Sequence, residues 1–104
     1  MRFTGDEDHS ISLNDAAQLT GRYRAQMETS ELKGGYFGRA AIISILSQTD
    51  CVGIRYYYGL DAEDKQVIVL VGVLANGDDM VEGELAEFSI PCPDSCGANN
   101  DLNS

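Results

Sequence analysis

The sequence has few of the residues from which catalytic and metal sites are usually built. Its 104 residues include three cysteines, one histidine, two prolines and no tryptophan. The histidine, His9, lies in an acidic N-terminal stretch that we expect to be exposed, so we predict no catalytic residues and no enzyme activity. The glycine-rich "GGYFG" neither follows a strand pattern nor contains the Lys-Ser or Lys-Thr of a phosphate-binding loop, and we predict no cofactor.

Bases are almost missing from the second half of the chain. Residues 1–58 carry seven acids and six bases, a net charge of −1, whereas residues 59–104 carry ten acids and only Lys65, a net charge of −9, which together give −10. Affinity for nucleic acid comes largely from Lys and Arg, so this charge argues against DNA and RNA as partners. An acidic face keeps a small protein soluble, and it could also attract a basic protein partner.

Long apolar runs are missing as well. The longest, "AAIISIL" and "VIVLVGVLA", are less than half of a bilayer span, and acids occupy the N-terminal positions where a secretory signal would be apolar. We therefore expect a cytoplasmic protein that does not enter the membrane. A chain of this length forms one core. We predict a single domain over residues 1–104, with a loose arm (1–11), a helix-helix-hairpin core (12–90), and a Cys/Pro turn with a polar tail (91–104).

Helical periodicity predicts two helices before the middle of the chain. Ser12 is a typical N-cap, Asp15 completes the capping pair, and apolar residues then recur at spacings of three and four for about fifteen residues. The adjacent glycines Gly34 and Gly35 end this region. A second helix is predicted over residues 36–48, and its broad apolar face suggests that it lies deeper than the first. The pair Ile42-Ile43 leaves a strand as the alternative for this segment.

The period changes to two after Cys51. "CVGIRYYYG" and "QVIVLVGVLA" are rich in Val, Ile and Tyr, and the polar "LDAEDK" between them predicts an antiparallel hairpin. "NGDD" predicts a turn, and residues 81–90 could form a short third strand or an irregular crossing segment. Pro91 and Pro93 argue against regular structure near the C-terminus. The predicted fold is α+β, with two N-terminal helices packed on the hairpin and an irregular C-terminal tail.

Three stretches together resemble a family of small bacterial proteins that has no assigned activity. They are "GGYFGRAAIISILSQTDCVGIRYYYG", "VIVLVGVLANGDDM" and "PCPDSCGANNDLN", which contain a GIR strand, a VGV strand, an Asn-Gly-Asp turn and a C-terminal Pro-Cys motif. The resemblance covers residues 12–103. Leu74-Ala75 and Asp94 depart from the pattern. The resemblance implies the helix-helix-hairpin layout and brings no catalytic residues with it.

Cys92 and Cys96 in "PCPDSC" could bind metal, cycle electrons or staple a turn. A zinc site needs about four ligands, and Cys51, His9 and this pair lie on distant segments. A redox dithiol usually has two intervening residues rather than three. A disulfide would close only a small loop, and in a reducing cytoplasm it would be mostly open. Two thiols in a proline-fixed turn are the favoured interpretation, and Cys92 and Cys96 stay weak metal candidates.

Arg55 and Tyr57 are the candidate ligand-binding residues. Arg55 lies inside a strand beside three tyrosines, where it could hold a carboxylate or stack on Tyr57. The more ordinary interpretation is an arginine whose stem packs at the sheet margin and whose head pairs with a local acid. Four acids, Asp78, Asp79, Glu82 and Glu84, lack the spacing of a calcium loop and are more typical of a solvated turn.

The second hairpin strand is apolar on both faces, which predicts self-association. In "VIVLVGVL", Val69 and Val71 point to one side and Leu70 to the other, so two helices on one face would leave the second face bare. The open edges of a two-stranded sheet also invite pairing. We therefore expect a non-enzymatic protein that forms a homodimer through its hairpin, with Val69, Leu70 and Val71 as interface candidates.

Overall fold

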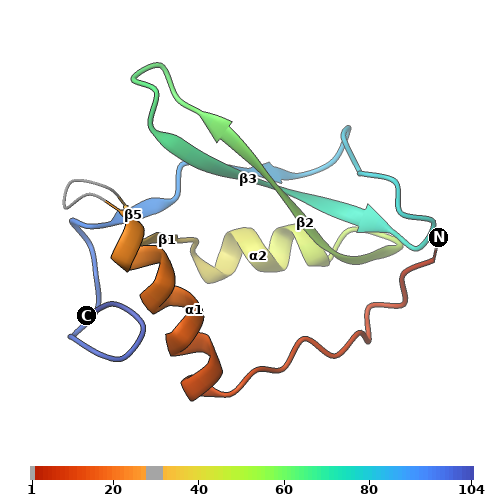
Figure 1. Cartoon of the computed structure of the whole chain (residues 1–104). Helices are drawn as coiled ribbons and strands as arrows, with labels where there is room; N and C mark the ends of the chain where they lie inside the picture. Colours follow the sequence, from red (N-terminus) through yellow and green to blue (C-terminus); the bar gives the residue numbers. More distant parts are fainter. Residues whose placement is uncertain (1, 28–31) are drawn as a thin grey trace. The chain divides into compact units, whose positions relative to one another are not determined.

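A computed structural model describes residues 2–27 and 32–104. These residues form an α+β fold with two helices and antiparallel strands in two sheets, as the sequence predicts (Figure 1). The elements are α1 (Leu13–Gln26), β1 (Gly34–Tyr36), α2 (Arg39–Leu46), β2 (Cys51–Leu60), β3 (Gln66–Leu74), β4 (Leu85–Ala86) and β5 (Ile90–Cys92). They group into two compact units. Unit 1 contains residues 2–7 and Phe37–Ser89, and unit 2 contains the described part of Asp8–Tyr36 together with Ile90–Ser104.

The predicted hairpin forms the sheet of unit 1. β2 and β3 pair from Leu60↔Gln66 to Cys51↔Leu74, with an irregularity between Cys51 and Gly53, and the strand order is β2-β3-β4. The "NGDD" turn also forms, because Gly77 takes a φ of 94° that a glycine adopts without steric cost, and its N–H donates to the Leu74 carbonyl. The third strand, β4, exists but is only two residues long.

The buried hydrophobic side chains of the described chain all lie in unit 1, on α2 and the middle strand. Ile45 is 1% exposed, and Leu70, Val71 and Val73 are 8%, 2% and 4% exposed. α2 contacts both β2 and β3, and Figure 1 shows it running beneath the two crossing strands. α2 begins at Arg39 rather than at residue 36, and its helical form rejects the strand alternative.

The beginning of the N-terminal arm is not loose. The Phe3 N–H donates to the Ala75 carbonyl at 2.7 Å, and the Phe3 ring lies under the Arg55 guanidinium, 5.7 Å from Cζ to the ring centroid. A side chain at Gly5 would meet the Val52 carbonyl oxygen at 2.8 Å. Periodicity could not predict these contacts, because they come from single residues of an extended segment.

Unit 2 confirms the predicted first helix and adds a sheet that the sequence did not predict. Ser12 caps α1, and its side chain accepts the Asp15 N–H at 3.0 Å. Gly34 and Gly35, which we expected only to break the chain, form β1 and pair with β5 as Gly34↔Cys92 and Gly35↔Pro91. Our expectation that Pro91 excludes regular structure was therefore wrong, because a proline fits a strand at the edge of a sheet.

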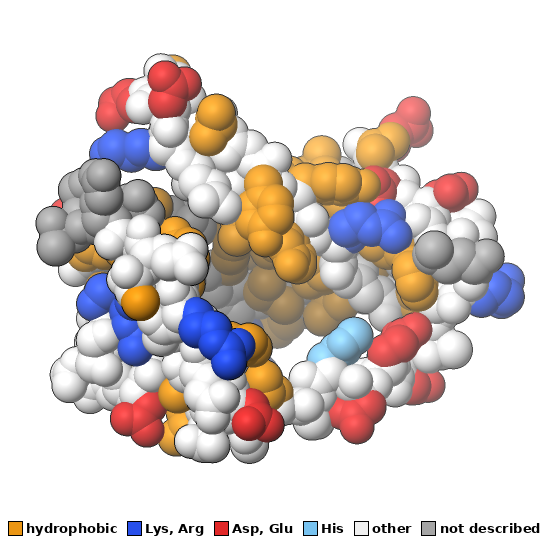
Figure 2. Space-filling model, in the orientation of Figure 1, with side chains coloured by type: hydrophobic (Ala, Val, Ile, Leu, Met, Phe, Trp, Pro, Cys, Tyr) orange, Lys and Arg blue, Asp and Glu red, His pale blue; other side chains and the backbone are white. Residues whose placement is uncertain are grey.

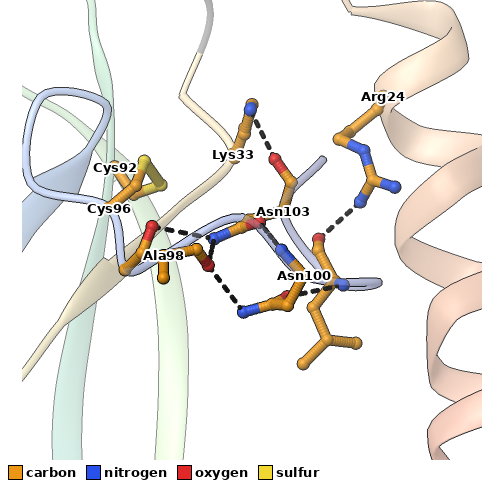
Figure 3. Close-up of a disulfide and its surroundings, with 9 residues drawn as sticks. Arg24, Lys33, Cys92, Cys96, Ala98, Asn100 and Asn103 are labelled. Carbon is orange, nitrogen blue, oxygen red and sulfur yellow. Dashed lines mark hydrogen bonds between the residues drawn. A yellow bond between two sulfur atoms is a disulfide. The ribbon is translucent and has the colours of Figure 1, made fainter.

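Cys92 and Cys96 are joined by a disulfide, with their Cα atoms 4.7 Å apart (Figure 3). The favoured interpretation of two free thiols was therefore wrong, and neither sulfur is a thiol that could bind a metal. The tail after it folds into turns around Asn103, whose side-chain amide donates to the Gly97 and Ala98 carbonyls. Two basic side chains bind the end of the tail: Lys33 donates to the Asn103 carbonyl at 2.5 Å and Arg24 to the Leu102 carbonyl. Neither described helix has the length and hydropathy of a membrane span.

Candidate functional site

Arg55 and Tyr57 converge on one acid, Asp79. Both lie on the same face of β2, and Asp79 is brought to them by the turn after β3, where it forms a bridge with Val73. Arg55 Nη1 binds Asp79 Oδ1 at 2.5 Å and donates to the Gly77 carbonyl at 2.9 Å, and the Tyr57 hydroxyl donates to Asp79 Oδ2. The two carboxylate oxygens are thus each engaged by a different side chain of β2.

These contacts shift the protonation of all three groups. The hydrogen bond from Tyr57 and the interaction with Arg55 lower the pKa of Asp79 below the 3.8 of a free side chain, although desolvation opposes them. The hydrogen bond to Asp79 raises the pKa of Tyr57 above 10.0, and it also raises the pKa of Arg55. Asp79 is therefore held as a carboxylate and Tyr57 as a neutral phenol over a wide pH range.

The cluster works as an internal clamp. Arg55 and Asp79 are only 30% and 20% exposed, and their charges neutralise each other. The clamp ties the 76–79 turn to β2, and Phe3 beneath Arg55 adds the N-terminal arm to the same contact. The predicted pairing of Arg55 with a local acid is present, whereas stacking on Tyr57 is replaced by stacking on Phe3.

The other sequence candidates are not part of the clamp. Cys92 and Cys96 belong to unit 2, and Cys51 of unit 1 is a free, half-buried thiol that contacts the Gly53 carbonyl. His9 is exposed. In the described residues, no three His, Cys, Asp or Glu side chains gather in a way that could hold a metal ion.

The structure places the exposed apolar surface of the hairpin on β2 rather than on β3. Of the interface candidates, Leu70 and Val71 are buried within the chain and Val69 is half-buried, because α2 and the clamp segments cover the middle strand. By contrast, four β2 side chains are exposed: Tyr56 (56%), Tyr57 (48%), Tyr58 (67%) and Leu60 (69%). Tyr56 and Tyr58 pack edge to face at 5.6 Å. Figure 2 shows hydrophobic side chains gathered over the hairpin.

Gln48 is a structural residue that sequence reasoning did not single out. Its side chain lies between two glycines of unit 1, since a Cβ at Gly72 would meet Nε2 at 2.8 Å and a Cβ at Gly83 would meet Oε1 at 2.1 Å. Oε1 accepts the Glu84 N–H at 2.7 Å and Nε2 donates to the Ile45 carbonyl at 2.8 Å. Gln48 thereby fixes the segment that leads into β4. The glycines at 72 and 83 were the available signal, because each leaves space for a neighbouring side chain.

No family model matches the chain, and comparisons with curated proteins and with solved structures also find no match. The family resemblance noted from the sequence therefore stays an expectation.

Proposed function

We propose that the chain is a non-enzymatic interaction protein that self-associates as a homodimer through the free edge of β2. The observation that carries this proposal is the position of β2 in the sheet. In the order β2-β3-β4, β2 has β3 on one side and no described strand on the other. The outward-facing N–H and C=O groups along most of this ten-residue strand are thus available for pairing, whereas Val52 near its start lies against Gly5 of the N-terminal arm.

The side chains of β2 support the same partner. Proteins usually protect an edge strand with prolines, lysines or inward-pointing charges, and "CVGIRYYYGL" contains none of the first two. Its one charge, Arg55, is neutralised by Asp79. The exposed tyrosines would pair with residues of the second copy across the new strand contact, where aromatic cross-strand pairs are favourable.

Charge explains why a second copy would meet the first at this strand. Two chains of net charge −10 repel each other, and the repulsion is smallest where acids are fewest. β2 carries no Asp or Glu, whereas the hairpin tip next to it carries Asp61, Glu63 and Asp64. Figure 2 shows the acidic side chains at the tip and the hydrophobic ones below it.

Charge insertion on matched residues tests the proposal. Tyr58→Glu adds a carboxylate to β2, and Val81→Glu adds one at a side chain that is equally exposed, 67% against 68%. We expect the wild type to be a dimer by light scattering at micromolar concentration, Tyr58→Glu to be a folded monomer, and Val81→Glu to remain a dimer. A monomeric wild type contradicts the proposal, as does equal dissociation of both variants.

A further inference from the structure

The opposite side of the sheet has a second open edge, on β3. β4 covers β3 only through the pairs Leu70↔Ala86 and Val71↔Leu85. The same antiparallel register would next place Glu87 opposite Val69 and Phe88 opposite Ile68, but these pairs do not form. Within the described chain, residues 66–69 therefore pair only with β2. We call the uncovered side of residues 66–69 the β3 half-edge.

Phe88 ends the β4 pairing. Its φ is 62°, a conformation that is unusual for a bulky side chain and that turns the chain away from the strand path. Its ring is 90% exposed, so burial of the ring within the chain does not compensate for the backbone strain. Strain that brings no internal packing is often retained for a functional contact. The aromatic side chain thus lies two residues after Ala86, where the pairing of β4 with β3 stops.

The surroundings of the half-edge define the chemistry of what it would bind. Glu84 and Glu87 flank β4, and the acids of the hairpin tip, Asp61, Glu63 and Asp64, precede Gln66 with Lys65 between them. Lys65 is the only base in the whole chain after residue 58. Leu85, three residues before Phe88, is 53% exposed and adds apolar surface to the same segment.

We propose that the β3 half-edge accepts an extended segment of another protein as an added strand, and that this segment alternates apolar and basic residues. Backbone hydrogen bonds to residues 66–69 would hold the segment, its apolar side chains would pack on Phe88, and its bases would meet the acids on both sides. A second copy of this chain fits poorly, because the acids around this edge, unlike the acid-free β2, would repel a chain whose net charge is −10. The site is separate from β2, so it does not depend on the proposed dimer.

A peptide titration tests this proposal. The probe is a short peptide that alternates lysine with valine and threonine, and two controls replace lysine by glutamate or methylate the backbone nitrogens on one edge. We expect the probe to bind at least about tenfold more tightly than either control, since methylation removes edge hydrogen bonds and glutamate reverses the charge. Amides of residues 66–69 should become protected from hydrogen exchange only with the probe.

Two variants separate the half-edge from diffuse attraction to an acidic protein. Phe88→Gly removes the ring at a position whose φ suits glycine, so the variant should fold at least as stably as the wild type. We expect it to bind the probe about tenfold more weakly. The control, Ile11→Ser, removes a 54% exposed apolar side chain of unit 2 and should bind as the wild type does.

Three results would overturn the proposal. They are the absence of probe binding to the wild type at millimolar concentration, equal affinity for the methylated peptide, and unchanged affinity in Phe88→Gly. The first would show that the half-edge binds no such segment, and either of the other two would mean that attraction of the peptide comes from net charge alone.

Discussion

The two units of this chain are stabilised in different ways. Unit 1 contains the four buried hydrophobic residues, Ile45, Leu70, Val71 and Val73. No described residue of unit 2 is buried, and α1 itself buries none. Unit 2 instead has the disulfide, the β1–β5 pairs and the hydrogen bonds of the tail. A short chain can thus combine a small hydrophobic core with a covalently stapled segment.

This difference in stabilising interactions predicts that the two units open locally at different free energies. Burial of apolar surface contributes roughly 25 cal/mol per Å², and solvent-exposed hydrogen bonds contribute little beyond those that water offers in the unfolded chain. Unit 2 should therefore open at a lower free energy than the β2–β3 hairpin of unit 1.

The largest effect is expected from truncation in the core of unit 1. Ile45→Ala should lower the free energy of unfolding by about 2–5 kcal/mol, because it removes a side chain that is 1% exposed and leaves a cavity. Ile43→Ala on the same helix is the control. Its side chain is 47% exposed, so the loss should be clearly smaller. Urea unfolding of both variants provides the measurement, and equal losses would show that α2 does not anchor the core.

Removal of the disulfide of unit 2 should give the next largest effect, and this effect should be confined to unit 2. Replacing Cys92 and Cys96 by serine opens a loop with a sequence separation of four, which costs about 2 kcal/mol in the chain-entropy model. The Lys33 N–H, which donates to the Cys92 carbonyl at 2.6 Å, should then exchange faster with solvent. Reduction of the wild type by a dithiol should do the same.

The amides of β3 serve as an internal control in the same exchange experiment. Val71 lies in the core of unit 1 and should keep its protection when the disulfide is removed. If its protection falls in parallel with that of Lys33, the two units unfold together and the comparison between them fails.

The parts of the fold that the sequence predicted are those with a local signal. One continuous stretch of sequence encodes each of these parts: the cap at Ser12, the period of α1, the hairpin and the "NGDD" turn. β1 and β5 lack such a signal, because each is three residues long and contains glycine or proline. They pair across more than fifty residues, as Gly34↔Cys92 shows, and only the tertiary fold brings them together.

The candidate site was predictable only in its components. Arg55 and Asp79 each stood out in the sequence, but their contact depends on the hairpin register and on the turn that follows β3. The sequence prediction placed the exposed apolar surface of the hairpin on β3 instead of β2 for a related reason. Periodicity shows that both faces of β3 are apolar, but it does not show that β4 pairs with this strand and α2 contacts it while β2 is left at the edge of the sheet.

The smallest expected effect concerns the clamp in unit 1 and appears as a dependence on pH. The folded-state pKa of Asp79 is lowered, chiefly by the hydrogen bond from Tyr57. The stabilising contribution of the Asp79 carboxylate is therefore fully present above the unfolded pKa of about 3.8, and it is lost as the pH falls through the lower folded pKa. Asp79→Asn has no carboxylate to protonate. It should therefore be less stable than the wild type at pH 7, and this difference should shrink on acidification below pH of about 4.

Glu82→Gln removes the same charge from an exposed position nearby and corrects for the general relief of acidic repulsion. Melting temperatures of the wild type and both variants across the acid range provide the measurement.

The raised pKa of Tyr57 gives the opposite sign at the alkaline end, because its contribution is present below about pH 10 and is lost as the pH rises through the folded value. Tyr57→Phe should thus flatten the alkaline limb and leave unit 2 unchanged. If the melting temperature of Asp79→Asn depends on acidic pH as that of the wild type does, the contact between Asp79, Arg55 and Tyr57 does not stabilise unit 1. The stability of unit 1 then rests on its hydrophobic core alone.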